Sequence, residues 1–487
     1  MINWSSEIPK AFCLTNGAGE ALSGGALAER IAQYRHALLS RTAPGTPVAV
    51  LADNSPDWIA LDMAAADLQV PFVPLPTFFS GAQLAHVLET ASVHALFCSD
   101  PGLAHSLGFP SRAPCNGKLG LFESTTLQPW AALDAVNKLT FTSGTTSTPK
   151  GVCLDMEQQW EVARALRESL QPLGIRRHLN LLPLPVLLEN VAGVYTAMQS
   201  AATNICVPLA AVGLTGSSAF DPVACLDAIA RHRAESIIVL PQMLAALTAA
   251  CTMNDRRTRS LKYVAVGGAR VPPALILAAR SKGIPAYEGY GLSECCSVVT
   301  VNTPRDDRVG STGKPLANRQ VRIADDGEIE VRAKRGVHYL GASFVADEWI
   351  RTGDLGKLDE DGFLHVDGRK KNVLITAYGR NVSPEWPEAA LAGAGPIAQA
   401  VVFGDSRPYL VAAIVPATPD IPDSALAAAV ERVNRLLPDY VQVRGWFRTE
   451  PLTAHDGLMT PNGRPRRDTI ARRFAQQIEH LYPPEGV

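Results

Sequence analysis

Short apolar runs alternate with longer helical patterns between residues 48 and 266, and this alternation constrains the fold more than any other feature. The first series has expected strands at 48–51, 70–74 and 95–98, with expected helices at 57–68 and 82–90. A second series has expected strands at 179–182, 205–207, 236–240 and 262–266. Because alternating strands and helices build parallel sheets covered by helices, the pattern predicts an α/β fold with two stacked α/β subdomains.

The rest of the chain has a different pattern of expected strands and helices. Between residues 298 and 366, short expected strands alternate with turns such as Asp326-Gly327, which predicts a small β-rich subdomain. Beyond Gly368, two expected strands and two expected helices indicate a compact α+β unit. A chain of 487 residues exceeds what one hydrophobic core usually serves. We therefore expect a large N-terminal domain at 1–367 and a small C-terminal α+β domain at 368–487.

A loop of hydroxyls and glycines follows the apolar run at residue 139 and ends in Lys150. Its candidate phosphate ligands are Thr142, Ser143, Gly144, Thr145, Thr146 and Lys150. Backbone N–H groups, hydroxyls and an ammonium together suit a polyanion, such as the phosphates of a nucleotide. The common phosphate loop needs Gly-Lys-Ser/Thr, whereas here Pro149 precedes the lysine and Gly151 follows it. A solvated surface turn is the alternative explanation for the loop taken alone.

Three further motifs follow in a fixed order. They are YEGYGLSE at 287–294, WIRTGDLG at 349–356 and GRKKNVLITAYGRNVSPE at 368–385. Taken together with the loop, the motifs resemble those of the acyl-adenylate-forming superfamily, which includes acyl-CoA synthetases, adenylation domains and luciferase. The resemblance runs from about residue 139 to the C-terminus, and the motif sequences are most similar to those of long-chain fatty acyl-CoA synthetases.

The resemblance implies a role for several residues. Tyr290 would offer its ring to adenine, and Gly289 and Gly291 would let the backbone approach the ligand. Ser293 would donate to the α-phosphate, and Glu294 would ligate Mg²⁺. Asp354 would accept hydrogen bonds from both ribose hydroxyls, beside Arg369. Lys371 would be the hinge about which a mobile C-terminal domain changes orientation.

The reaction implied by the resemblance has two steps. A carboxylate attacks the α-phosphate of ATP to give acyl-AMP and pyrophosphate, and the thiol of CoA then displaces AMP. The expected ligands are therefore ATP, Mg²⁺, CoA and a carboxylic acid. Two alternatives remain. One is delivery of the acyl group to a carrier protein, an amine or an alcohol, and the other is a catalytically impaired acyl-nucleotide-binding protein.

One departure concerns the signature near the C-terminus. Arg464 stands where the family has a lysine that reaches the carboxylate and the phosphate. Arginine keeps the charge, but its guanidinium is a planar fork and not a compact point donor. Slower adenylation, full substitution by Arg464, and replacement by another cation such as Arg466 all remain open.

The acid is expected beside segment 182–190 and beside Gly268 and Ala269. Val186 stands where many long-chain synthetases have a histidine, whereas Glu189 matches that subgroup. Amino-acid-activating relatives place an aspartate in this segment, and segment 182–190 has none. We therefore expect a medium- or long-chain fatty acid as the substrate.

Composition excludes several other classes of function. The net charge of -2 gives no reason to invoke nucleic acid, and no apolar run approaches the roughly 20 residues of a membrane helix. The nine cysteines are odd in number and lack Cys-x-x-Cys spacing, which argues against a zinc site or a disulfide framework. The N-terminus lacks a secretory pattern. We expect a cytoplasmic monomer or homodimer.

Overall fold

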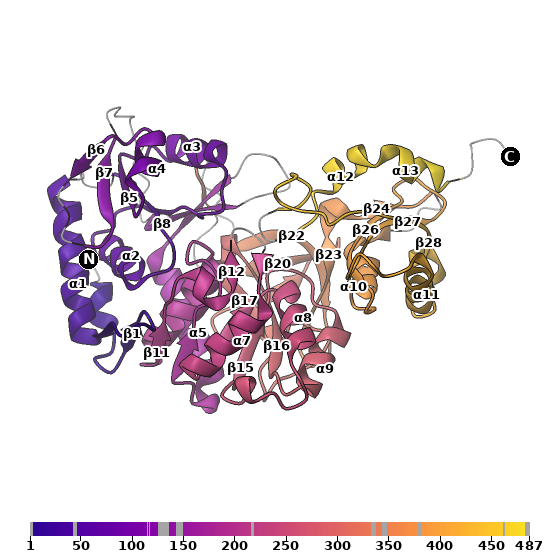
Figure 1. Ribbon diagram of the computed structural model, residues 1–487, viewed down its shortest axis with the longest axis horizontal. Coiled ribbons are helices and arrows are strands. Elements are labelled where there is room, and N and C mark those ends of the chain that lie inside the picture. Colours follow the sequence, from indigo (N-terminus) through magenta and orange to yellow (C-terminus); the bar gives the residue numbers. More distant parts are fainter. Residues whose placement is uncertain are drawn as a thin grey trace.

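The computed structural model describes residues 3–41, 46–113, 115, 117–124, 136–142, 150–215, 219–332, 338–342, 348–377, 381–460 and 463–482. Two large sheets, a four-stranded sheet and a smaller C-terminal domain make up this part of the chain (Figure 1). The predicted α/β architecture is confirmed. None of the helices in the described ranges is both long and apolar enough to cross a lipid bilayer.

The first sheet has eight strands in the order β21-β9-β8-β4-β3-β5-β7-β6. Their bounds are β3 Val48–Leu51, β4 Phe72–Pro74, β5 Ala95–Cys98, β6 Ser111–Ala113, β7 Gly120–Glu123, β8 Lys138–Thr142, β9 Lys150–Leu154 and β21 His338–Tyr339. The associated helices are α1 Gly24–Arg41, α2 Pro56–Asp67, α3 Gly81–Thr90 and α4 Pro101–Ser106. Helix α2 begins where a cap is expected, because the Ser55 side chain accepts a hydrogen bond from Trp58 N.

The second sheet has nine strands in the order β18-β17-β16-β15-β14-β10-β11-β1-β2. Their bounds are β1 Cys13–Thr15, β2 Ala21–Ser23, β10 Arg177–Leu179, β11 Thr203–Ile205, β14 Ser236–Val239, β15 Tyr263–Val266, β16 Ala286–Leu292, β17 Ser297–Val301 and β18 Lys314–Pro315. Strands β11, β10, β14, β15 and β16 are parallel. The N-terminal strand β1 joins this sheet by pairing with β11.

Helices cover both faces of the second sheet (Figure 1). They are α5 Met156–Leu170, α7 Pro222–His232, α8 Pro241–Ala250 and α9 Pro273–Ser281. A π-helix, η3 (Leu188–Tyr195), continues into α6 (Thr196–Gln199) and packs between α5 and the strands β14 and β17. Because π-helices are rare and concentrate at functional sites, this segment draws attention to the space between η3 and the sheet.

The β-rich region is a four-stranded antiparallel sheet. Its strands are β19 Val321–Ile323, β20 Glu328–Arg332, β22 Trp349–Leu358 and β23 Leu364–Arg369, in the order β19-β20-β22-β23. Asp354 on β22 pairs directly with Arg369 on β23. Strand pairing thus brings together two residues that come from different sequence motifs.

The C-terminal domain has its own sheet, β26-β27-β28, and its own apolar cores. Its elements are β24 Leu374–Ile375, β25 Asn381–Val382, β26 Ile397–Phe403, β27 Leu410–Pro416, β28 Val443–Arg448, α10 Glu385–Ala392, α11 Asp423–Asn434, α12 Arg467–Arg473 and α13 Ala475–His480. The domain lies at one end of the molecule, beside β22 and β23 (Figure 1). Its last two helices are separate, because Phe474 between them leaves the helical conformation (φ -108°, ψ 22°).

Candidate active site

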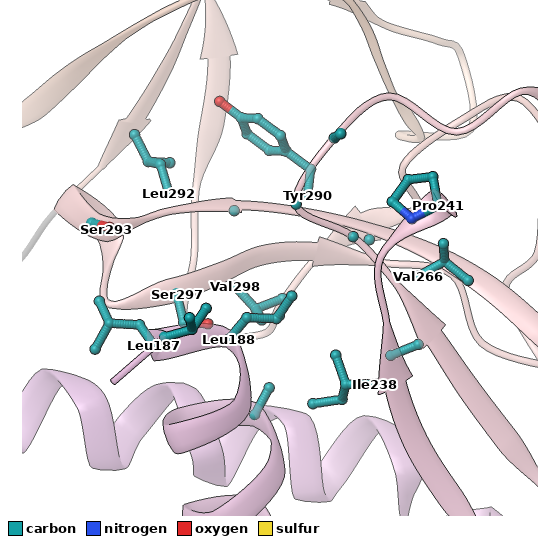
Figure 2. A pocket seen from close by; sticks show the side chains of 18 of the residues that line it. Leu187, Leu188, Ile238, Pro241, Val266, Tyr290, Leu292, Ser293, Ser297 and Val298 are labelled. Atoms are coloured by element: carbon teal, nitrogen blue, oxygen red, sulfur yellow. The ribbon is translucent and has the colours of Figure 1, made fainter. Parts of the chain in front are cut away.

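A cavity of about 1690 Å³ extends from the boundary between the C-terminal domain and the large domain into the space between the second sheet and η3. Figure 2 shows its inner part, where the apolar side chains of Leu188, Ile238, Val266 and Val298 surround one space. Tyr290 and Ser293 lie along the strand above that space. The cavity therefore joins an apolar compartment to the polar motifs.

Three side chains from three strands meet at the polar end. The Asp354 Oδ1 atom lies 2.8 Å from Arg369 Nε, and the Tyr290 hydroxyl donates to Asp354 Oδ2 over 2.6 Å. Burial raises the pKa of Asp354, while the Arg369 guanidinium and the Tyr290 hydroxyl oppose that rise. Asp354 thus accepts charge-assisted hydrogen bonds from Arg369 and Tyr290. A carboxylate held in this way could also accept hydrogen bonds from the two hydroxyls of a ribose.

Glycines on β16 shape the strand that carries Tyr290. The pairing of β16 with β17 shifts between Tyr290 and Gly291, which is a β-bulge. A Cβ atom on Gly291 would lie 1.7 Å from Ser297 O, and one on Gly289 would lie 3.1 Å from Thr300 O. Position 291 therefore tolerates only glycine, because the bulge brings two backbones together at the ligand-facing edge.

The phosphate loop is described only at its two ends. Thr142 closes β8 and pairs with Lys150, the first residue of β9, and Lys150 is exposed to the cavity. Ser143, Gly144, Thr145 and Thr146 lie outside the described residues. The antiparallel pairing of β8 with β9 fixes both ends of the loop at the polar end of the cavity.

Glu294 and Ser293 follow β16 and line the same cavity. The Tyr339 hydroxyl donates to Glu294 Oε1 over 2.9 Å. No group of three or more His, Cys, Asp or Glu side chains in the described ranges could hold a metal ion. Glu294 therefore fits Mg²⁺ only in the manner usual for nucleotide sites, where one carboxylate is joined by phosphate oxygens and water.

Arg464 enters the site from the C-terminal domain. Its Nη2 and Nε atoms donate to Gly268 O over 2.9 and 3.3 Å. The Arg464 side chain is accessible from the cavity, and the cavity walls lie close around its guanidinium group. Burial and repulsion by Arg369 lower the pKa of Arg464, whereas Asp354 favours its charged form. Arg464 thus stands between the Asp354 carboxylate and the apolar compartment.

The two arginines that follow Arg464 in the sequence, Arg466 and Arg467, make contacts within the C-terminal domain. Arg467 pairs with Glu388 inside the C-terminal domain and also donates to Val402 O over 2.8 Å. Arg466 contributes its backbone N–H to Leu458 O. Of the two, Arg467 is a structural residue, because its partner is a carboxylate buried in its own domain.

Four cations gather where phosphates are expected: Lys150, Arg369, Lys371 and Arg464. The pKa of Lys371 is lowered by burial and by the charges of Arg369 and Lys150. Like charges held this close repel one another, so the arrangement is suited to a polyanion that neutralises them. Gly268 and Ala269, at the end of β15, line the neighbouring wall, and Gly268 has a positive φ of 86° that favours glycine.

Sequence reasoning missed two polar residues of this site. Tyr339 reaches Glu294 because β21, a strand of two residues, pairs with β9. Thr352 accepts from Arg369 Nη1 through its carbonyl, and its hydroxyl accepts from Asp354 N. Thr352 could have been suspected because it lies two residues before Asp354 in the motif. No local signal marked Tyr339, whose partner lies 45 residues away along the chain.

Comparison with known proteins places the chain among nucleotide-dependent ligases. The AMP-binding enzyme model matches residues 3–345, and the AMP-binding enzyme C-terminal domain model matches residues 371–485. The long-chain-fatty-acid–CoA ligase FadD15 of Mycobacterium bovis is 29% identical, over 91% of this chain and 88% of that protein. The 2-succinylbenzoate–CoA ligase of Bacillus velezensis is also 29% identical, over 75% of this chain and 76% of that protein.

Solved structures agree in fold. The anthranilate CoA ligase AuaEII in complex with anthranoyl-AMP superposes with a TM-score of 0.80 at 20% identity, covering 95% of this chain and 94% of that one. The amide bond synthetase McbA of Marinactinospora thermotolerans gives a TM-score of 0.78 at 25% identity, with 97% and 98% coverage. The family model spans well over half of the chain, and the resemblance found in the motifs is confirmed. The chain belongs to the AMP-binding enzyme family.

Proposed function

We propose that the protein activates a medium- or long-chain carboxylic acid with ATP and transfers the acyl group to the thiol of CoA. An AMP-forming acid–thiol ligase follows from the family and from the names of its curated relatives. The observation that carries the proposal is the position of Arg464. Its guanidinium lies between the Asp354–Arg369 pair and the carbonyl of Gly268, at the entrance to the apolar compartment.

In the first step, Asp354 holds the ribose and the cations hold the phosphates. The carboxylate of the acid attacks the α-phosphorus, the bond to the bridging oxygen breaks, and pyrophosphate leaves with the electron pair. Charge accumulates on the phosphoryl oxygens in such a transition state, so preorganised cations are the main source of rate. Lys150 and Arg464 supply that charge from opposite domains.

Magnesium, when bound, would neutralise phosphate charge, and Glu294 is the residue proposed to hold it. The carboxylate lines the cavity, and Tyr339 fixes one of its oxygens. Ser293, next to Glu294, is proposed to donate its hydroxyl to the α-phosphate. The remaining ligands of the ion would come from the nucleotide and from water.

In the second step, the thiolate of CoA attacks the acyl carbonyl, the thioester forms and AMP leaves. We propose that the C-terminal domain rotates about Lys371 between the steps, so that Arg464 withdraws and the thiol gains access. The support is the arrangement at the boundary. Arg464 Nη2 donates to Gly268 O over 2.9 Å, and Ser383 Oγ donates to Asp367 O over 2.7 Å. Both contacts between the two domains are polar hydrogen bonds, which suit an interface that opens.

The apolar compartment supports a fatty acid as the substrate. The cavity of about 1690 Å³, which includes both the polar end and the apolar compartment, exceeds the roughly 300–1,000 Å³ of most small-molecule sites. The face of the sheet toward η3 carries small residues such as Ala265 and Gly289, opposite Ala192, Gly193 and Ala197 of the helical segment. Relatives are named for fatty, succinylbenzoate and indoleacetate substrates, so chain length is the property to test.

The test is carboxylate-dependent pyrophosphate release with Mg-ATP, across fatty acids of increasing length and aryl acids, with and without CoA. We expect release to depend on acid and ATP, to rise with CoA, and to yield an acyl-CoA visible by mass spectrometry. A preference for aryl acids would contradict the fatty-acid assignment. No release with any acid would favour the impaired, acyl-nucleotide-binding alternative.

An amine acceptor is the second candidate, because one structural neighbour at 25% identity is named an amide bond synthetase. Pyrophosphate release without thioester, together with amide formation when an amine is supplied, would favour that candidate. The same assay can include a phosphopantetheinylated carrier protein as a third acceptor.

A further inference from the structure

The inner part of the apolar compartment contains a polar pair, His178 and Ser236. The two residues lie opposite each other on the parallel strands β10 and β14, and both line the cavity. His178 Nδ1 is 2.9 Å from Ser236 Oγ, and His178 Nε2 is 2.9 Å from Glu189 Oε1. Apolar residues such as Ile238 and Ala197 line the same cavity, as do polar ones such as Gln199. The pair therefore offers polar atoms on a wall that a purely hydrocarbon tail would leave unused.

Glu189 is already saturated and serves to hold the imidazole. Its two oxygens accept from His178, from Asn180 Nδ2 over 2.9 Å, and from the backbone N–H groups of Leu181 and Leu182 over 3.1 and 2.9 Å. A Cβ atom at Gly193 would lie 2.6 Å from His178 Nε2 and 2.3 Å from Glu189 Oε1. The π-helix therefore needs glycine at 193, and the ring of His178 is fixed in one place.

Ser236 is the member of the pair with hydrogen-bonding capacity left. Among the described residues, its hydroxyl contacts only His178 Nδ1, although a hydroxyl can donate once and accept twice. It is nine-tenths buried, with 6% exposure, and it borders the cavity. A purely hydrocarbon tail would exclude water from the Ser236 hydroxyl without replacing the hydrogen bonds that water makes. The binding free energy of such a tail would therefore be less favourable.

We propose that the tail of the native acid carries a hydroxyl or keto oxygen that hydrogen-bonds to Ser236. This inference rests on the proposed function and specifies its substrate class, an oxygenated aliphatic acid. Ser236 pairs with Tyr263, the first residue of β15, and Gly268 lies just beyond the end of that strand at Val266. The three residues from Tyr263 to Val266 span about 10 Å and the five from Tyr263 to Gly268 about 17 Å, which corresponds to roughly eight to thirteen carbons of an extended chain.

The experiment compares decanoic acid with 10-hydroxydecanoic and 9-oxodecanoic acids, by kcat/KM for pyrophosphate release. We expect the wild-type protein to prefer at least one oxygenated acid about tenfold, the discrimination of one hydrogen bond to a buried group. Ser236→Ala should remove that preference while retaining turnover of decanoic acid. Because a ketone oxygen can only accept, a preference for the oxo acid over decanoic acid indicates that Ser236 donates, whereas a preference for the hydroxy acid alone indicates that Ser236 accepts.

Ser311→Ala is the matched control, because Ser311 is a buried hydroxyl that donates to Arg308 O over 2.9 Å and is not part of the cavity wall. It should change turnover of the three acids by the same factor. Equal use of the three acids by the wild-type protein would overturn the inference and leave the proposed function standing, as would a preference that survives Ser236→Ala. The wild-type comparison requires no variant to fold. Absence of release with every acid tested, including the longer panel, would overturn both.

Discussion

The two ends of the cavity are built in different ways. At the nucleotide end, the side chains of Asp354, Arg369 and Tyr290 contact one another from three strands, and Arg464 adds its charge from the C-terminal domain. At the acyl end, the wall is made largely of apolar residues from one sheet face and one π-helix, interrupted by His178 and Ser236. The nucleotide end is thus characterised by its charged and polar side chains, and the acyl end by the size and shape of its cavity.

The difference teaches which property each end controls. On the proposed function, charge and hydrogen bonding at the nucleotide end act on a group common to all substrates, so a change there should affect every acid alike. The acyl end would contact only the tail, so a change there should affect acids unequally. Variants at each end test whether the effect of a substitution is the same for every acid or depends on the acid.

The largest effect is expected from Arg464→Ala. Removing a preorganised cation from a phosphoryl-transfer site costs roughly 10²–10³-fold in rate. Pyrophosphate release should fall by that factor for every acid, whereas thioester formation from supplied acyl-AMP should change less than about threefold. Arg444→Ala, an exposed arginine on β28, is the control. Equal losses in both half-reactions would contradict the role of Arg464 in the first step.

Asp354→Asn should lower kcat/KM for ATP by about 100-fold, because a hydrogen bond to a charged group typically contributes about 1.5–3 kcal/mol. Arg369 would lose its ionic partner, and the ribose would lose a carboxylate acceptor. The measurement is nucleotide affinity by calorimetry, alongside turnover. Asp361→Asn, at an exposed aspartate paired with Arg308, should leave both unchanged. An effect confined to one acid would blur the distinction between the two ends.

Ala265→Phe tests the acyl end. Ala265 lies between Ile238 and Tyr287 in the sheet and faces the cavity. A phenyl ring there should fill part of the compartment and reduce turnover of long acids at least about tenfold, the scale of several lost methylene contacts at about 0.8 kcal/mol each. Short acids should be spared. Ala274→Phe, on the exposed surface of α9, should leave the length profile unchanged.

Glu294→Gln should lower turnover about tenfold at saturating magnesium and raise the magnesium concentration needed for half-maximal rate. The amide keeps the shape and the contact with Tyr339 but is a poorer ligand for a hard cation. A magnesium titration of pyrophosphate release measures both quantities. An unchanged magnesium requirement would remove Glu294 from the metal site.

The smallest effect on turnover is expected from Glu288→Gln, whose readout is stability. Burial raises the pKa of Glu288 to about 8, from 4.5. The neutral carboxyl favours the folded state, so its contribution is complete below pH 4.5 and is lost as the pH rises through about 8. The loss is at most about 5 kcal/mol, at about 1.4 kcal/mol per pKa unit. Urea unfolding at pH 5 and pH 8.5 should show a smaller decline for the variant.

The sequence predicted the nucleotide end better than the acyl end, for a physical reason. Asp354, Arg369 and Tyr290 stand in compact motifs because a fixed ligand requires particular groups at fixed spacing, and the structure brings all three together. The strands at 48–51 and 95–98 were also predicted with their observed bounds, because each is a short apolar run followed by a helix.

Long-range pairing explains what was not predicted. Strands β1 and β21 are two or three residues long, and their partners lie about 190 residues away along the chain, so no local pattern marks them. Tyr339 reaches Glu294 only through the pairing of β21. His178 and Ser236 are 58 residues apart and meet only through the strand register. The rare π-helix cannot be distinguished from an α-helix by apolar spacing.

The entry of Arg464 from the C-terminal domain has a consequence for the order in which the protein is made. The pairing of Asp354 with Arg369 and both walls of the acyl compartment are encoded before residue 371, and the cation that completes them is encoded near the end of the chain. During synthesis, domains fold as they emerge, N-terminal first. If Arg464 has the role proposed for it, a nascent or truncated chain that stops short of residue 464 would hold nucleotide and acid side by side but join them far more slowly, so completion of the polypeptide would itself start efficient chemistry.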